Sequence, residues 1–197
     1  MCLELMENTI FHLSKNSDFN EAQIAYLIKE TLTGVAFLHT LNRLHRDLKS
    51  DNILYNLQGD IKISDFGFST QVTIDELLKT SMIGTPSWMA PEIVSGEGYS
   101  NKIDIWAIGV LVFELAEKKL PFSGTNSVEI LCNARNLACP ELSHKWGIQM
   151  KEFHSLCFEK NPELRPAASE LLMHGFLEKA SKEEFLKLIL KNEENLC

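Results

Sequence analysis

The chain has 197 residues, of which 45% are hydrophobic and 23% are charged, and its formal net charge is −8 at pH 7. This length and composition are those of a globular protein with one domain and a substantial core. The acidic balance argues against a nucleic-acid-binding surface, which needs clustered lysine and arginine. It fits either a preference for basic substrate peptides or a merely solvated exterior.

Cysteine usage and hydropathy bear on the cellular compartment. The five cysteines are odd in number and form no C-x-x-C pair, which favours a reducing compartment and no structural zinc. The longest apolar run, residues 105–113, is too short to cross a bilayer, for which about 20 residues are needed. The first residues carry no basic cluster, so we find no secretory signal and expect a cytoplasmic protein.

The first forty residues predict one long helix after a short apolar start. Residues 1–5 are mostly apolar, and residues 6–9 are typical of a turn. Asn20 fits an N-cap, and apolar residues recur after it with helical spacing. We therefore expect an amphipathic helix that ends near His39 and buries Ile24, Leu27, Ile28, Leu32 and Val35.

A β-hairpin is predicted over residues 52–65. Two short aliphatic runs, Ile53–Tyr55 and Ile61–Ile63, flank a polar turn that contains Gly59. A hairpin brings its two ends together, so we expect the Asn52 amide and the Asp65 carboxylate to meet at one end, with Asp47 close by. Oxygen ligands of this kind suit Mg²⁺, whose shell substrate phosphates and water complete.

The remaining elements are mostly helical. A long polar loop follows the hairpin, and residues 104–115 are apolar on nearly every face, which predicts a buried core helix. Shorter helices are expected near residues 127–135, 149–158 and 167–173. The last 20 residues predict an amphipathic helix, which either packs on the domain or binds a partner.

Three motifs in order resemble those of the protein kinase family. They are His45-Arg46-Asp47-Leu48-Lys49-Ser50-Asp51-Asn52, then Asp65-Phe66-Gly67, then Ala90-Pro91-Glu92. Together with residues 84–92, they most resemble the sterile-20-like serine/threonine kinases of the Rho-GTPase-activated branch. The resemblance implies an α+β, mostly helical fold, with the kinase large lobe over residues 1–177 and a helical tail over 178–197.

The resemblance also assigns roles to residues. Asp47 would be the catalytic base, Lys49 would sit by the transferring phosphate, and Asn52 and Asp65 would hold Mg²⁺ on ATP. Thr85 would line the acceptor pocket and bond to Asp47 and Lys49; its alternative is a simple turn with Pro86. The backbone near Glu4 and Met6 would face adenine at the hinge, unless this segment is only a frayed terminus.

Other residues would regulate or support the site. Ser81, or its neighbour Thr80, would be the activating phosphosite and pair with Arg46, unless it is a plain surface hydroxyl. Supporting roles fall on a further group. His45 would pack under the loop, and Asp104 would bond the loop backbone or serve as a helix N-cap. Glu92 would form a buried ion pair with Arg165, and Gly67 would complete the metal-binding triplet.

Two functions follow from these expectations. One is an ATP-dependent serine/threonine kinase that acts on protein substrates in signalling, with an upstream Rho-type GTPase engaged through a region outside this sequence. The 197 residues contain no G-x-G-x-x-G and no strand lysine of the V-A-I-K type, so we expect the small lobe to be absent and nucleotide binding by this chain alone to be poor. The alternative is a catalytically silent large lobe that acts as a scaffold or decoy.

Overall fold

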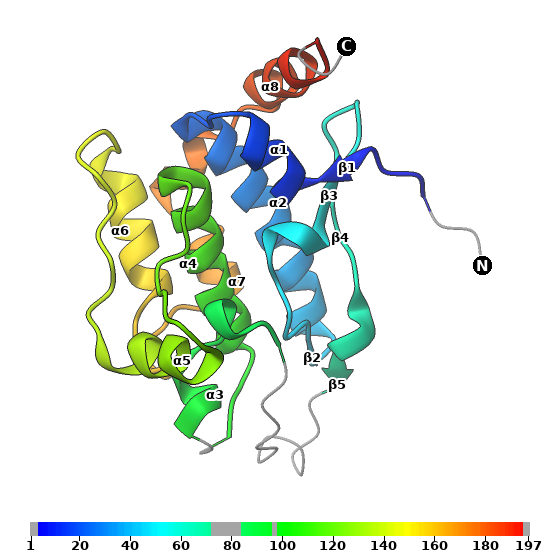
Figure 1. The fold of residues 1–197 in the computed structure, drawn as a ribbon. Coiled ribbons are helices and arrows are strands. Elements are labelled where there is room, and N and C mark those ends of the chain that lie inside the picture. Colours follow the sequence, from blue (N-terminus) through cyan, green and yellow to red (C-terminus); the bar gives the residue numbers. More distant parts are fainter. Residues whose placement is uncertain (1–3, 72–83, 96–97, 195–197) are drawn as a thin grey trace.

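The structure, a computed structural model, describes residues 4–71, 84–95 and 98–194. A group of helices makes up one part of the molecule, and a small three-stranded antiparallel sheet and a separate antiparallel strand pair lie beside it (Figure 1). The helices are α1 Ile10–Asn16, α2 Glu21–Thr40, α3 Pro91–Ser95, α4 Lys102–Glu117, α5 Ser127–Asn136, α6 Ile148–Cys157, α7 Ala168–Leu171 and α8 Lys182–Glu194. The strands are β1 Asn8–Thr9, β2 Arg43–Leu44, β3 Ile53–Tyr55, β4 Ile61–Ile63 and β5 Thr70–Gln71.

Helix α4 is the centre of the core, as its apolar sequence predicts. Of its 16 residues, 13 are buried. Gly109 lets α6 approach closely, because a Cβ at this position would lie 2.8 Å from Cys157 Cβ and 2.9 Å from the Phe158 ring. The stacked ring of Phe122 and the edge of Phe158 pack on Trp106 in the same core.

Helix α2 confirms the prediction of a long amphipathic helix. Asn20 is the N-cap, and it forms a capping box with Gln23, in which each side chain accepts a hydrogen bond from the other residue's backbone N–H. The predicted apolar face is fully buried. The helix ends at Thr40, so it delivers the chain directly to the segment that carries His45 and Asp47.

The predicted hairpin is present, with β3 and β4 antiparallel and Ile53 opposite Ile63. Asn56 organises its turn by accepting hydrogen bonds from the backbone N–H groups of Gln58 and Asp60. Gly59 has a φ of +78°, a left-handed conformation that glycine adopts without the cost a side chain would add.

The start of the chain differs from the prediction. Instead of a turn over residues 6–9, Asn8–Thr9 form β1, which pairs with β3, and the N–H of Glu7 donates to Tyr55 O at 2.8 Å. The pairing partner lies more than forty residues away, so local sequence gives no sign of it. Thr9 then caps α1 through its side chain. Residues 4–7, which include the described part of the apolar start, have no regular secondary structure.

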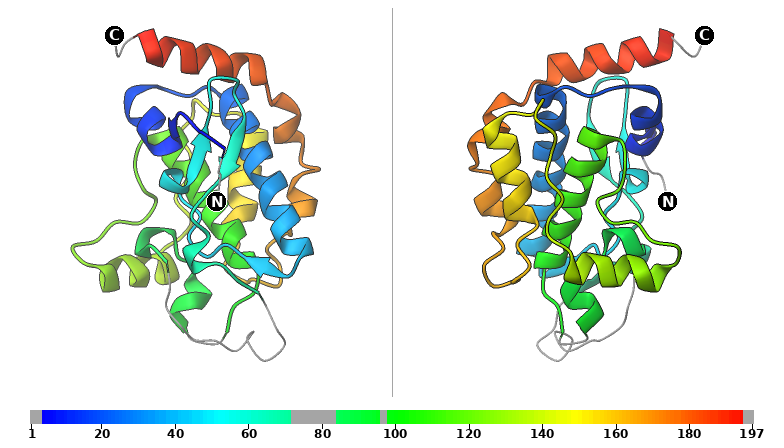
Figure 2. Two further views of the ribbon diagram at one scale, coloured as in Figure 1. Left: turned by 90° about the vertical axis from the view of Figure 1, so that its right-hand side faces the viewer. Right: turned by 60° about the vertical axis from the view of Figure 1, so that its left-hand side comes forward.

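The later helices agree with the expected positions, except that the one expected over 167–173 is shorter. Helix α7 ends at Leu171, and a 3₁₀ segment, Gly175–Lys179, follows. Helix α8 packs across one end of the molecule (Figure 2) and buries its apolar face, which contains Phe185, Leu188 and Ile189. Among the described helices, none combines the length and hydropathy that a bilayer span requires.

Candidate active site

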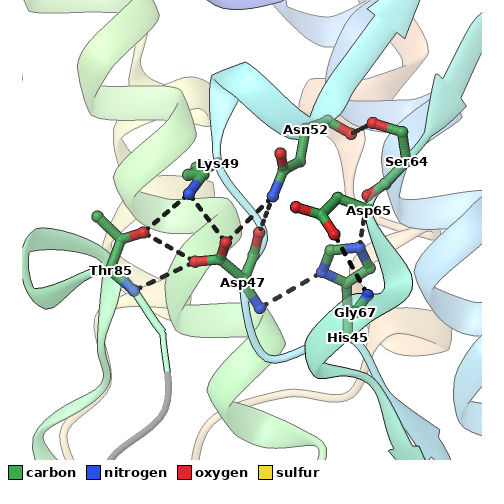
Figure 3. Close-up of polar contacts among 8 residues, drawn as sticks. All are labelled: His45, Asp47, Lys49, Asn52, Ser64, Asp65, Gly67 and Thr85. Carbon is green, nitrogen blue, oxygen red and sulfur yellow. Dashed lines mark hydrogen bonds and ion pairs between the residues drawn. The ribbon is translucent and has the colours of Figure 1, made fainter.

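Asp47 is the centre of a buried hydrogen-bonded cluster in which three predicted residues meet (Figure 3). Its side chain is 3% exposed. One carboxylate oxygen accepts hydrogen bonds from the Thr85 hydroxyl at 2.8 Å and from the Thr85 backbone N–H at 3.1 Å. The other oxygen lies 2.8 Å from Lys49 Nζ. The segment 84–95 is thereby connected to the loop that follows α2.

Lys49 closes the cluster by donating to the Thr85 hydroxyl oxygen at 3.0 Å. The directions are consistent, because that hydroxyl accepts from Lys49 and passes its own hydrogen to Asp47. Burial raises the pKa of Asp47, but the hydrogen bonds from Lys49 and Thr85 outweigh it and hold the pKa below its ordinary value. Asp47 is therefore a carboxylate at neutral pH.

Asn52 joins the cluster through its amide nitrogen. This nitrogen donates to the Asp47 backbone carbonyl at 2.9 Å and to its carboxylate at 3.2 Å. Both partners are acceptors, so the orientation of the amide is determined, and its oxygen faces away from Asp47. That oxygen accepts no hydrogen bond from the residues that the structure describes, which leaves it available as a ligand.

Asp65 lies at the same end of the hairpin as Asn52. The Ser64 N–H donates to the Asn52 carbonyl at 2.8 Å, which places Asn52 opposite the residue just before Asp65. The Asp65 carboxylate extends toward the Asn52 side chain in Figure 3. Asp65 has a φ of 60°, and its Oδ1 accepts from the Gly67 N–H at 3.2 Å. This bond gives Gly67 a local role in orienting the carboxylate.

His45 connects the Asp47 loop with the hairpin. The imidazole is fully buried; its Nε2 lies 3.0 Å from the Ser64 carbonyl, and its Nδ1 accepts from the Asp47 N–H at 3.4 Å. Because a carbonyl can only accept, the proton is on Nε2. The ring also contacts Phe66 edge-on. His45 thus has the supporting position that the sequence predicted.

Asp104, on α4, holds the backbone of the same loop. Its carboxylate is buried and accepts hydrogen bonds at 3.0 Å from the N–H groups of His45 and Arg46. The alternative role as an N-cap is wrong, because Asn101 occupies that position. His39 also lies 2.9 Å from Asp104. The sequence did not reveal this contact, since only the fold brings the end of α2 to α4.

Arg46 is partly exposed, and its backbone lies in the left-handed region at φ 70°. Its guanidinium donates to the Phe68 carbonyl and to the Tyr99 hydroxyl, the latter at 3.2 Å. Tyr99 was not predicted as a partner. Thr80 and Ser81, the predicted phosphosites, lie outside the described residues.

Glu92 and Arg165 form the expected buried ion pair. Two guanidinium nitrogens lie 2.7 and 3.1 Å from the two carboxylate oxygens, and Arg165 is 0% exposed. Arg165 also donates to the carbonyls of Lys102 and Glu159, and it lies over the Trp106 ring. The pair therefore fastens α3 to the helical core.

The two predicted hinge residues, Glu4 and Met6, lie in the segment before β1. Glu4 is exposed and lies 3.4 Å from Lys62 on β4, and Met6 is partly buried just before β1. Within the described ranges, no hydrogen bond joins either of them to Asp47, Asn52 or Asp65.

Ser50 and Glu114 form a contact beside the site that the sequence did not reveal. The Ser50 hydroxyl donates to one Glu114 oxygen at 3.0 Å, and the other oxygen is buried with no hydrogen-bond partner in the described part of the chain. Burial raises the pKa of Glu114 from 4.5 to about 7. Below about pH 7, Glu114 is therefore mainly protonated in the folded state.

Glu114 is expected to make stability depend on pH. The folded-state pKa is above the unfolded one, so the stabilising effect of protonation is complete below about pH 4.5 and is lost as pH rises through 7. Glu114→Gln keeps a neutral acceptor for Ser50 at every pH. The variant should therefore gain on the order of 2–3 kcal/mol relative to the unaltered protein between pH 5 and pH 8. Urea unfolding of both proteins at pH 5 and at pH 8 checks this. If the free energies of unfolding of the two proteins differ by the same amount at both pH values, the prediction is contradicted.

Comparison with known proteins identifies the family. The protein kinase domain family matches residues 1–177. The serine/threonine-protein kinase SKM1 of Saccharomyces cerevisiae is 42% identical over 178 residues, which are 89% of this chain and 27% of SKM1. PakA of Dictyostelium discoideum is 39% identical over 178 residues, 89% of this chain and 15% of pakA. Shk1/pak1 of Schizosaccharomyces pombe is 39% identical over 183 residues, 91% of this chain and 28% of that kinase.

The chain thus spans between about a seventh and a little over a quarter of the length of these relatives. Residues 1–177, which match the protein kinase domain family, include the hairpin, the Asp47 cluster and the Glu92–Arg165 pair. The protein kinase family uses ATP and a divalent metal in general. The chain belongs to the protein kinase family and, within it, to the sterile-20-like group of serine/threonine kinases.

Proposed function

We propose that the protein containing these 197 residues is a serine/threonine protein kinase, which transfers the γ-phosphoryl group of ATP to hydroxyl groups of protein substrates in signalling. The observation that carries the proposal is the cluster in which Lys49 and Thr85 hold the buried Asp47 carboxylate beside Asn52, with Asp65 at the same end of the hairpin as Asn52. Phosphoryl transfer requires groups in these positions, because its catalysis consists largely of positioning and charge stabilisation.

Asp47 is suited to receive the proton of a substrate hydroxyl. It is ionised at neutral pH, and the hydrogen bonds from Thr85 and Lys49 keep its carboxylate in one orientation. Lys49 supplies a positive charge next to the acceptor position, where negative charge on a transferring phosphoryl group needs stabilisation. Thr85 positions both groups through its hydroxyl and its backbone N–H.

Asn52 and Asp65 fit a magnesium ion that carries ATP. The donor chemistry is right, since an amide oxygen and a carboxylate are hard ligands, and the Asn52 oxygen is directed away from Asp47 with no protein partner among the described residues. Bound Mg²⁺ supplies neutralisation of the phosphate charges. The chain's own part is to keep these two oxygens at one end of the hairpin. The backbone near Glu4 and Met6 remains the proposed adenine-facing segment.

Serine and threonine are the proposed acceptors because the relatives in the comparison are named serine/threonine kinases and Lys49 follows Asp47 by two residues. A Rho-type GTPase remains the proposed upstream partner, as the resemblance of residues 84–92 and the three motifs to the Rho-GTPase-activated branch implies. Ser81, or alternatively Thr80, remains the proposed activating phosphosite, and its phosphate would pair with Arg46. The free thiols of Cys132, Cys139 and Cys157 support a cytoplasmic location.

The proposal is tested by nucleotide binding and by phosphoryl transfer together. Mg·ATP should raise the melting temperature of the protein, and labelled phosphate should reach peptides with serine or threonine but not their tyrosine counterparts. Asp65→Asn should abolish both effects, because it removes a charged metal ligand. Asp18→Asn, at a side chain that is 97% exposed, is the matched control and should change neither.

The scaffold alternative makes the opposite prediction. It expects no thermal shift and no transfer in the unaltered protein, with Asp65→Asn behaving identically. The family match and the names of the relatives do not favour it.

A further inference from the structure

Helix α8 lies beyond the residues that match the kinase family, yet it covers the turn of the hairpin at the end opposite Asn52 and Asp65 (Figure 2). Lys182 Nζ lies 2.7 Å from the Asp60 carboxylate. A Cβ at Gly59 would come within 3.0 Å of Leu186 Cδ2, so the helix touches the turn backbone directly. The contact is close because Gly59 has no side chain.

Phe185 supports the same turn from inside. It is fully buried, and its ring centroid lies 5.4 Å from that of Tyr26 and 6.5 Å from that of Tyr55. The Tyr26 hydroxyl donates to the Gly59 carbonyl at 2.9 Å, and Tyr55 is the last residue of β3. Phe185 therefore contacts one residue that holds the turn and one residue of the hairpin itself.

The C-terminal part of α8 contacts the chain just after α1, the helix that follows β1. Asn192 is buried, and its Oδ1 accepts a hydrogen bond from the Ser17 hydroxyl, just after α1, at 3.4 Å. Helix α1 follows β1, which pairs with β3. One helix thus connects the hairpin turn with the chain that borders the hairpin.

The hairpin needs such support. Each strand has three residues, so about 10 Å of strand separates the turn from the metal-facing end. A two-stranded hairpin is only marginally stable by itself, so its position depends on the elements that pack against it, which include β1 along β3 and α8 at the turn. A displaced turn would therefore misplace Asn52 and Asp65.

We propose that α8 positions the metal-binding side chains Asn52 and Asp65 by holding the hairpin turn, with Phe185 and Leu186 as positioning residues. The inference rests on the proposed function for the identity of the ligand. Lys182 and Asp60 are 46% and 45% exposed, and an exposed ion pair contributes little, so the apolar contacts carry the effect.

The test compares two identical substitutions on one helix. Leu186→Ala removes the side chain that touches the turn, whereas Leu190→Ala changes a side chain that is 58% exposed. In the protein containing this chain, Leu186→Ala should speed hydrogen exchange at the Ser64 and Asp60 amides by about tenfold relative to the amides of α4. It should also raise several-fold the Mg²⁺ concentration that half-saturates ATP binding. Leu190→Ala should leave both quantities unchanged. Phe185→Ala should increase both the exchange rate and the Mg²⁺ requirement by more than Leu186→Ala does.

Three results would overturn the inference. In the first, Leu186→Ala and Leu190→Ala change hydrogen exchange and the Mg²⁺ requirement to the same extent. In the second, Leu186→Ala speeds exchange in α4 as much as in the hairpin. In the third, it speeds exchange in the hairpin but leaves the Mg²⁺ requirement unchanged. Failure of the proposed function looks different, because the unaltered protein would then show no Mg²⁺-dependent ATP binding at all. In that case the proposed function fails, and so does the claim that α8 positions metal ligands. The hydrogen-exchange comparison then still shows whether α8 holds the hairpin turn.

Discussion

Replacing Asp47 with asparagine is expected to lower kcat for phosphoryl transfer by about 10²–10⁴-fold while leaving the KM for Mg·ATP nearly unchanged. The substitution preserves size but removes the charge and the proton acceptor. In the unaltered protein, that carboxylate receives hydrogen bonds from both Thr85 donors and pairs with Lys49. Steady-state kinetics on the protein that contains this chain measures the split between kcat and KM.

The control for this prediction is again Asp18→Asn, whose kinetics should equal those of the unaltered protein. A melting curve shows whether the Asp47→Asn variant is folded. Asp47 has a folded-state pKa below its unfolded value, so its ionised form stabilises the fold at neutral pH, and this stability is lost as pH falls through the folded pKa. Some loss of stability in the variant is therefore expected at pH 7. A folded variant that keeps more than a tenth of the normal kcat would contradict the assigned role.

Replacing Arg165 with methionine is expected to lower the free energy of unfolding by about 3–5 kcal/mol. The change leaves the Glu92 carboxylate, which is 8% exposed, without the two guanidinium hydrogen bonds at 2.7 and 3.1 Å. It also takes a donor from the carbonyls of Lys102 and Glu159. Urea denaturation measures the difference, and the double variant Glu92→Leu/Arg165→Met should lose less than the sum of the single variants.

Lys179→Met is the matched control for the buried pair. Lys179 Nζ lies 2.7 Å from Glu21, the same separation as in the Glu92 pair, but its side chain is 41% exposed. Solvent screens an exposed pair, so this substitution should cost about 1 kcal/mol or less. Equal losses from Arg165→Met and Lys179→Met would show that burial does not matter at Arg165.

Features with local signals could be predicted from the sequence. The helical spacing after Asn20 predicted α2, and the uninterrupted apolar run predicted a buried α4. The two aliphatic runs around Gly59 predicted the hairpin and the end at which Asn52 and Asp65 lie. Each of these features depends on residues that are close in sequence, where periodicity and turn chemistry act directly.

Contacts between distant segments could not be predicted in the same way. The pairing of Asn8–Thr9 with β3, the bond between His39 and Asp104, and the contact of Ser50 with Glu114 all join elements that only the tertiary fold brings together. A serine within a catalytic motif shows no sign of its partner. The packing of α8 on the hairpin turn was missed for the same reason, although its amphipathic pattern was clear.

Paramagnetic NMR with Mn²⁺ tests most directly whether one end of the hairpin gathers the metal-binding oxygens. Mn²⁺ accepts the same carboxylate and carbonyl oxygens as Mg²⁺. In the presence of ATP, it should broaden the amide signals of Asp47, Asn52 and Asp65 before those of α6, and Asp65→Asn should remove the effect. Broadening centred on another surface, or equal broadening with and without the Asp65 carboxylate, would contradict this account of the site.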